Sequence, residues 1–237
     1  MQGSEAKLYF QSLDDKSECV GIYTEGNLYF DNLPTDLTHT WRHSGAISDN
    51  TVEYAWIISG GKNLVDVCPD HLKSELAANQ AKFKAYLQSF RIAKINLREL
   101  CFFDLVPEDF LLSFCETKNK ITKHVFDNYD KPDNYEHLAN VHRLLHKIKY
   151  NTLNTNNSDC RELMTNSRDR NLIQRLLNGP QHIDYNLFGA VTGRLTTNPG
   201  SFPILTLKKE MRQNLKPCND LFVSLDYNGA EVRTLLE

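Results

Sequence analysis

The residues with the clearest capacity for chemistry lie near the end of the sequence. An apolar run, residues 221–225, leads into Asp226, and Gly229 allows a tight turn before Glu231. A carboxylate at the end of a strand is a common ligand for a hard divalent cation such as Mg²⁺. The same position is equally typical of a helix cap or a turn. The spacing alone therefore leaves a metal site and a structural acid as alternatives.

Two arginines upstream could bring positive charge to such a site. Arg194 follows Thr192 and Gly193, and Arg212 lies in the basic stretch 208–217. Taken alone, an arginine after a turn is an ordinary surface charge. In the same way, Glu231 alone is an ordinary first-turn acid, favoured by the helix dipole.

The net charge of the chain is -3, but it is unevenly distributed. Residues 1–150 sum to -4, residues 151–217 to +4 and residues 218–237 to -3. A basic segment running into an acidic one suits a polyanion held beside a metal ion. Differences of this size are also common in proteins, so the charge pattern supports a polyanion partner only weakly.

Length and composition indicate a globular protein with a buried core. The chain has 237 residues, 41% of them hydrophobic, which is enough for about two structural units. Mean hydropathy is -0.48, and no apolar run approaches the roughly 20 residues of a membrane span. The first residues lack the charged-then-apolar pattern of a secretory signal. We therefore expect a soluble, cytoplasmic protein with no membrane partner.

Neither the cysteines nor the histidines are spaced as zinc ligands. The six cysteines include no Cys-x-x-Cys pair and have no paired histidine spacing. We interpret them as buried thiols in a reducing compartment. His142 and His146 are one helical turn apart, but no third ligand or intervening glutamate accompanies them. We interpret these two histidines as surface or otherwise polar helix positions.

Residues 1–68 are predicted to form a small β-rich module. Turn signals separate short β-prone runs at residues 7–10, 19–23, 27–30 and 54–58. A proofreading nuclease needs an Asp-x-Glu at the end of its first strand, and the loop at residues 12–18 lacks that spacing. The module therefore has no intact exonuclease motif, and a structural or partner-binding role is the preferred interpretation.

Residues 69–180 are predicted to be helical. Apolar residues recur at helical spacing, and we expect helices over residues 72–90, 107–126, 133–150 and 172–177. A proline followed by two acids at residues 107–109 suits a first helical turn. The second and third helices outline a hairpin. Such a hairpin could project and grip a nucleic-acid backbone, or it could pack on its own domain, and both alternatives stay open.

Residues 181–237 are predicted to return to strands, at residues 183–189, 191–197 and 221–225. The strand that ends at Asp226 is followed by the opening of a helix at residues 231–236. A β-rich module, a helical region and a second strand-containing region together predict the α+β class.

Four short motifs in this last region together resemble the family A DNA polymerases. They lie in order within about 42 residues: Thr192-Gly193-Arg194-Leu195-Thr196-Thr197, Phe202-Pro203, Met211-Arg212-Gln213 and Asp226-Tyr227-Asn228-Gly229-Ala230-Glu231-Val232-Arg233. The match is to the start of the palm in bacterial DNA polymerase one and, more closely, in replicative polymerases of marine bacteriophages. The helices at residues 107–150 look like the family's thumb, a softer resemblance. Residues 1–68 match no motif of the family.

The resemblance implies a role for each matching residue. Asp226 is similar to the first palm aspartate, which bridges two Mg²⁺ ions, and the main chain at Tyr227 would complete the metal and phosphate contacts. Glu231 matches the steric gate that excludes a ribose 2′-hydroxyl. Arg194 matches the arginine that reaches the minor-groove edge of the primer terminus, where all base pairs present similar acceptors. Thr192 belongs to the same primer-binding motif.

The remaining motif positions carry less specific expectations. Arg212 fits the family's basic position before the palm strand and is expected to contact primer–template DNA. Gly193 and Arg233 complete their motifs. Asn228 and Gly229 replace the family's commoner Ser-Gln, a change outside the metal and gate positions.

The family also needs parts that these 237 residues do not contain. A fingers helix binds the incoming dNTP, and a second palm carboxylate lies in a His-Asp-Glu type motif. We therefore expect an N-terminal part of a phage DNA polymerase, in the cytoplasm of an infected bacterial host, that is inactive alone. A second polypeptide or a further C-terminal part would supply the fingers and the rest of the palm. The alternative is a non-catalytic DNA-binding or assembly module derived from a polymerase thumb and palm.

Overall fold

The computed structural model describes residues 7–15, 18–45, 47, 51–97, 99–156, 167–178 and 181–224. Within these residues the fold is mixed α and β, and the chain divides into two compact units. One unit contains residues 1–150 and 184–198, and the other contains residues 151–183 and 199–237. Each unit is described separately.

The first unit begins with an antiparallel sheet of β1 (Phe10–Asp15), β2 (Glu18–Thr24) and β3 (Asn27–Tyr29), in the order β1-β2-β3. Glu25 and Gly26 between β2 and β3 both have positive φ, 49° and 84°. Two positive φ values are typical of the type I′ turn, whose twist matches that of a two-residue hairpin.

A parallel pair extends this sheet on the side of β1. It consists of β4 (His39–Thr40) and β5 (Glu53–Tyr54). A parallel bridge joins Tyr9 to His39, and the main-chain N–H groups of Thr38 and His39 both donate to the Leu8 carbonyl at 3.1 Å. The strands therefore lie in the order β3-β2-β1-β4-β5, and β1, β4 and β5 run in the same direction.

The prediction of a strand over residues 54–58 is wrong. Strand β5 ends at Tyr54, and the next residues form the helical turn α1 (Ala55–Ile58), which Gly60 and Gly61 follow with positive φ. All four residues of α1 are buried. A short, continuously apolar run fits a buried helical turn as well as a buried strand, because neither needs a polar face.

Three long helices complete the first unit, and the sequence predicts each of them. They are α2 (Lys73–Ile92), which follows the 3₁₀ turn η1 (Asp70–Leu72), α3 (Glu108–Asn128) and α4 (Tyr135–Tyr150). Helix α3 begins directly after Pro107, with two acids in its first turn. The apolar periodicity of α4 predicts that both Leu144 and Leu145 face inward. In the structure Leu145 is buried, and the adjacent Leu144 is 56% exposed.

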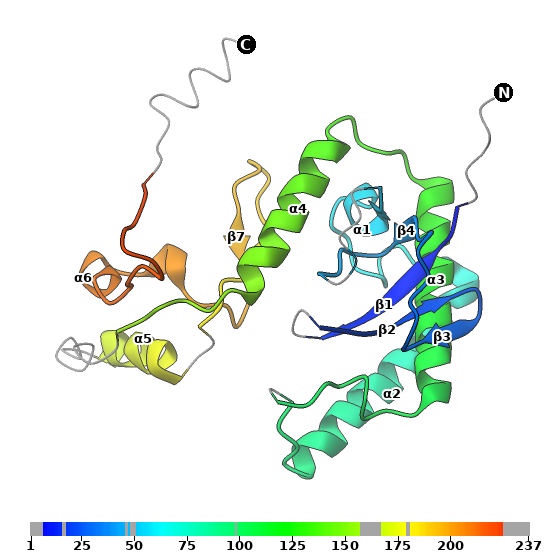
Figure 1. Ribbon diagram of the computed structural model, residues 1–237, viewed down its shortest axis with the longest axis horizontal. Helices are drawn as coiled ribbons and strands as arrows, with labels where there is room; N and C mark the ends of the chain where they lie inside the picture. The colour runs from blue at the N-terminus through cyan, green and yellow to red at the C-terminus, as the bar shows by residue number, and fades with distance from the viewer. Residues whose placement is uncertain are drawn as a thin grey trace. The chain divides into compact units, whose positions relative to one another are not determined.

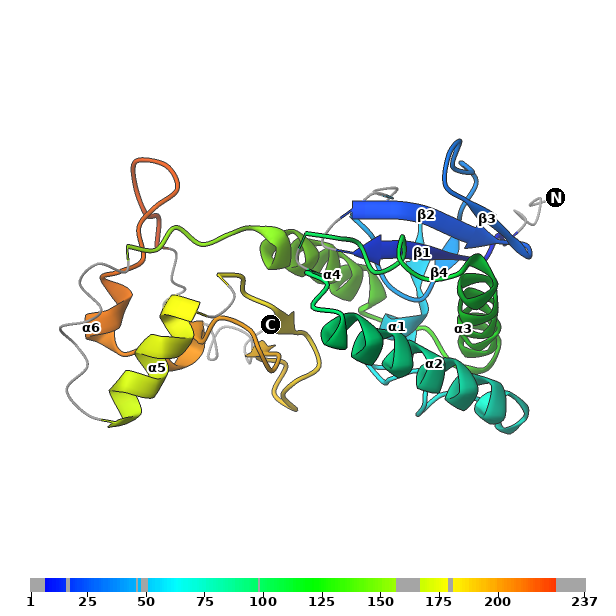
Figure 2. The ribbon, with the colours of Figure 1, turned by 90° about the horizontal axis from the view of Figure 1, so that it is seen from below.

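The hairpin of α3 and α4 packs on its own unit. Helix α3 contacts α1, α2, β1, β2 and β4, as the two ribbon views show (Figures 1 and 2). Its Ile121 and Val125 are fully buried in the same hydrophobic cluster as Ile22 of β2 and Leu145 of α4. Of the two alternatives for this hairpin, the structure therefore has the packed one.

The short hairpin near the motif residues also belongs to the first unit. It pairs β6 (Tyr185–Asn186) with β7 (Thr196–Thr197) in antiparallel fashion. Its Leu187 is buried in the main hydrophobic cluster. The structure thus groups residues differently from the expected segments 1–68, 69–180 and 181–237, because strands and helices from all three share one core.

The second unit is small and built on short elements. They are α5 (Ser167–Asn178), the 3₁₀ turn η3 (Ile204–Thr206) and α6 (Lys209–Arg212). Its buried apolar side chains are Ile173, Leu176, Ile183, Phe202, Leu207 and Met211. Among the described residues, no helix combines the length and the apolar character needed to cross a membrane.

Candidate functional site

One cavity of the first unit lies where its parallel strands end. Its volume is about 690 Å³. Asp14 lies near the carboxyl end of β1, Arg42 and His43 follow β4, and Trp56 follows β5, and all four line the cavity. The carboxyl ends of parallel strands are the usual place for ligands in such sheets, because the loops that follow them converge there. Strand β1 runs antiparallel to β2 on one side and parallel to β4 on the other, so the strand direction changes at β1.

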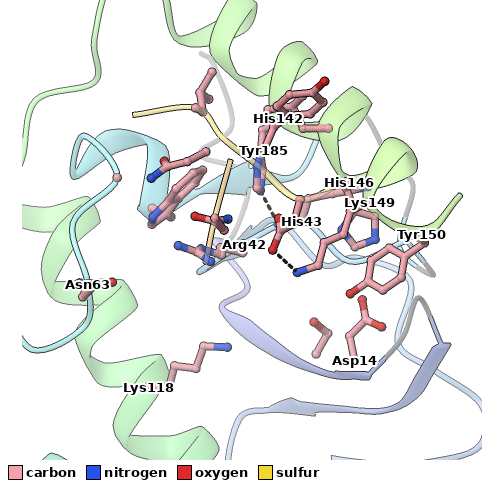
Figure 3. Close-up of a pocket in the computed structure, with 18 of the residues that line it drawn as sticks. Asp14, Arg42, His43, Asn63, Lys118, His142, His146, Lys149, Tyr150 and Tyr185 are labelled. Carbon is pink, nitrogen blue, oxygen red and sulfur yellow. Dashed lines mark hydrogen bonds and ion pairs between the residues drawn. The ribbon is translucent and has the colours of Figure 1, made fainter. Parts of the chain in front are cut away.

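Helices form the opposite walls of the cavity. Helix α3 contributes Cys115 and Lys118, and the C-terminal half of α4 contributes His142, His146, Lys149 and Tyr150 (Figure 3). Residues 184–187 of the second hairpin complete the lining. Segments from residue 12 to residue 198 thus meet around one space.

Three histidines form a packed cluster on one wall. The main-chain N–H of His43 donates to Nε2 of His142 at 3.3 Å, and Nδ1 of His43 lies 3.0 Å from the Tyr54 hydroxyl. The rings of His43 and His146 are 4.8 Å apart, centre to centre. Because Nε2 of His142 accepts a hydrogen bond, it cannot carry a proton, and the ring is the neutral tautomer protonated on Nδ1.

The surroundings of this cluster favour neutral imidazoles. Burial, together with the nearby Arg42 guanidinium, lowers the pKa of His142 to about 3. Burial, together with His146, lowers the pKa of His43 to about 4. The interpretation of His142 and His146 as surface positions is therefore wrong, because α4 turns this face toward the unit's interior.

Three cationic side chains face the same cavity. The Arg42 guanidinium lies 4.2 Å from the centre of the Trp56 ring, a cation–π geometry. Lys149 forms an ion pair with Asp184 at 3.3 Å. Burial lowers the pKa of Lys118, and the charge of Arg42 lowers it further while Asp14 opposes the shift. Among the described residues, the Lys118 ammonium has no hydrogen bond and no ion pair.

The described part of the chain does not offer a metal centre in this cavity. No group of three or more His, Cys, Asp or Glu side chains there is arranged to hold a metal ion. The two lining carboxylates, Asp14 and Asp184, stand among cations and neutral imidazoles instead. The lining thus has three cations, Arg42, Lys118 and Lys149, against two carboxylates.

The predicted primer-binding motif lies on the loop between β6 and β7. Gly193 has φ of 74°, and its main-chain N–H donates to the Ala190 carbonyl at 3.2 Å, which closes a turn. A Cβ at Gly193 would meet no atom within 4 Å, so the backbone conformation alone explains the glycine. Thr192 and Arg194, on either side of it, are exposed.

Arg212 belongs to the second unit, at the end of α6. Its Nε donates to the Leu207 carbonyl at 3.1 Å, and the side chain is otherwise exposed. The remaining predicted site residues, Asp226, Tyr227, Glu231 and Arg233, lie outside the described residues. The structure therefore describes the residues expected to contact DNA, but not those expected to bind metal or to exclude the ribose 2′-hydroxyl.

Sequence reasoning missed the cavity. Its cations come from a loop after β4, from α3 and from α4, and no local pattern joins them. The one available signal was the spacing of His142 and His146, which places two imidazoles on the same helix face.

Comparisons with protein-family models, with curated proteins and with solved structures find no match for this chain.

Proposed function

We propose that this chain carries part of a family A DNA polymerase and acts in template-directed nucleotidyl transfer during phage DNA replication. The observation that carries the proposal is the ordered series of four motifs between residues 192 and 233. Each motif is short, but their order and spacing are those of the beginning of a palm. The chain would act in the cytoplasm of an infected bacterial host.

In this proposal the motif residues hold the primer end and the metal ions. Asp226 and the main chain of Tyr227 would hold two Mg²⁺ ions, which activate the primer 3′-hydroxyl and stabilise the leaving pyrophosphate. Glu231 would exclude ribonucleotides by its bulk. The helices at residues 107–150 precede the palm in chain order, as the family's thumb does.

The geometry around Arg194 supports its proposed role. The side chain is exposed and follows a turn that requires glycine at position 193. The hairpin that carries it is fixed to the first unit through buried Leu187. An exposed arginine on an anchored turn can reach a minor groove without rearrangement of the core. The partners would be primer–template DNA, dNTPs and a polypeptide with the fingers and the second palm carboxylate.

A second candidate function is a DNA-binding or assembly module without chemistry. It is favoured by the packing of α3 and α4 into the first unit, since a helix buried on several sides forms a scaffold. The two candidates share DNA binding and differ in whether synthesis occurs.

DNA binding through Arg194 is tested with a fluorescently labelled primer–template. We expect Arg194→Ala to weaken binding about tenfold, because an arginine–base contact is worth about 1–3 kcal/mol. Fluorescence anisotropy titrations at two salt concentrations measure the affinity. The control is Lys84→Ala, which removes an exposed cation on α2. Equal affinities of the Arg194 variant and the control would contradict the role of Arg194.

A further inference from the structure

The cavity at the ends of β1, β4 and β5 has the size and lining of a small-molecule site. Ligand pockets in proteins measure about 300–1,000 Å³, and this one measures about 690 Å³. It lies wholly within the first unit, and none of the motif residues 192–194 line it. It is therefore a feature separate from the proposed primer-binding turn.

The charges in the cavity are suited to an anion. Lys149 is neutralised by its ion pair with Asp184. The charge of Arg42 disfavours the charged form of Lys118, whereas Asp14 favours it, and Asp184 favours the charged form of Arg42. Both cations line the cavity and are labelled in Figure 3. Arg42 is exposed and Lys118 is half-buried. The three cations outnumber the two carboxylates of the lining, Asp14 and Asp184, so the lining carries a net positive charge. A phosphate group would supply negative charge beside these cations.

The rest of the lining is aromatic and apolar. The aromatic residues that line the cavity include Phe83, Phe103, Phe114, Tyr150 and Tyr185. A lining with both cations and aromatic rings is suited to a molecule that has a phosphate and a flat ring. Because the described residues offer no metal-ligand group, the phosphate would be held by side chains and not through a cation.

We propose that this cavity binds a small phosphate monoester with a flat aromatic body, its phosphate held by Lys118 and Arg42 without a metal ion.

Isothermal titration calorimetry of the full chain tests the proposal, with dAMP as the probe and EDTA present. Ribose 5-phosphate, inorganic phosphate and adenosine are titrated in parallel to separate the contributions of phosphate and ring. We expect dAMP to bind more tightly than the other three, and EDTA to leave its affinity unchanged. No binding of dAMP at millimolar concentration would overturn the proposal, as would loss of binding in EDTA. Equal binding of inorganic phosphate and dAMP would overturn the role of the aromatic walls.

The cation is tested with matched lysine variants on α3. Lys118→Met is expected to weaken dAMP binding at least tenfold, and Lys118→Arg to retain most of it, because arginine keeps the charge. The control is Lys123→Met, an exposed lysine on the same helix that does not line the cavity. Thermal unfolding verifies that each variant is folded. Equal affinities of Lys118→Met and Lys123→Met would overturn the assignment of the phosphate to Lys118.

Discussion

His142 is held neutral by the groups packed around it. Its Nε2 accepts the main-chain N–H of His43 at 3.3 Å, and the Trp56 ring lies 4.9 Å away. The charged groups nearby are Arg42 and Arg143, both cationic. Burial and these cationic neighbours both disfavour the protonated imidazole. The pKa of His142 is therefore lower in the folded state than in the unfolded chain.

The stability of the protein should therefore fall in mild acid. The pKa of His142 is about 3 in the folded state, against about 6.5 in an unfolded chain. Below pH 6.5 the unfolded state binds a proton that the folded state does not, so unfolding becomes easier as the pH drops. We expect a loss of roughly 3 kcal/mol between pH 6.5 and pH 4 from this residue. Urea unfolding at a series of pH values measures it.

The matched variants for this prediction lie on one helix. His142→Gln keeps a hydrogen-bond acceptor but cannot titrate, so its unfolding free energy should depend less on pH than that of the wild type. His137→Gln removes an exposed histidine of α4 and should leave the pH dependence unchanged. If His142→Gln and wild type lose stability equally between pH 6.5 and pH 4, His142 is not the group responsible.

At the scale of elements, a polar network fixes α2 against α3. Asn79 of α2 is 2% exposed. Its Nδ2 donates to Oγ1 of Thr117 at 2.8 Å and to the Ser113 carbonyl at 3.1 Å, and the Ser113 hydroxyl donates back to Oδ1 of Asn79 at 3.0 Å. Asn79 and Thr117 are buried and Ser113 is half-buried, so these bonds help to specify how the two helices align.

Removal of this amide should destabilise the helix pair. We expect Asn79→Ala to lower the unfolding free energy by about 1–3 kcal/mol, because it removes three hydrogen bonds between α2 and α3 at a buried position. Denaturant unfolding followed by circular dichroism measures the loss. Gln88→Ala, at an exposed position of the same helix, should change stability by less than about 0.5 kcal/mol. Similar stabilities of the two variants would show that the network does not hold the helices together.

Elements with a strong local signal could be predicted, and those set by tertiary contacts could not. Pro107 with two following acids located the start of α3, and the periodicity of α2 and α4 is visible in the chain. The run at residues 54–58 carried no period and was read as a strand, whereas it packs as the buried turn α1. The cavity depends on Asp14, Lys118 and Lys149 meeting in space, which no spacing along the chain reveals.

At the scale of the whole molecule, the first unit contains both candidate functional features. A mixed sheet with α2, α3 and α4 builds the basic cavity, and the β6–β7 hairpin presents Arg194 on an exposed turn. The motif series runs from this hairpin into the second unit and ends in residues outside the described ones. The polymerase proposal therefore depends on Asp226, whose chemistry must be tested directly.

The most direct measurement is primer extension on a labelled primer–template with dNTPs and Mg²⁺. The chain is assayed alone and together with the polypeptide that supplies the fingers and the second palm carboxylate. The account predicts no synthesis by the chain alone and Mg²⁺-dependent synthesis by the pair. Asp226→Ala should abolish this synthesis, and Asp220→Ala, at an exposed acid just before the motif, should not. Synthesis that survives Asp226→Ala, or a pair that binds the primer–template yet never extends it, would contradict the account.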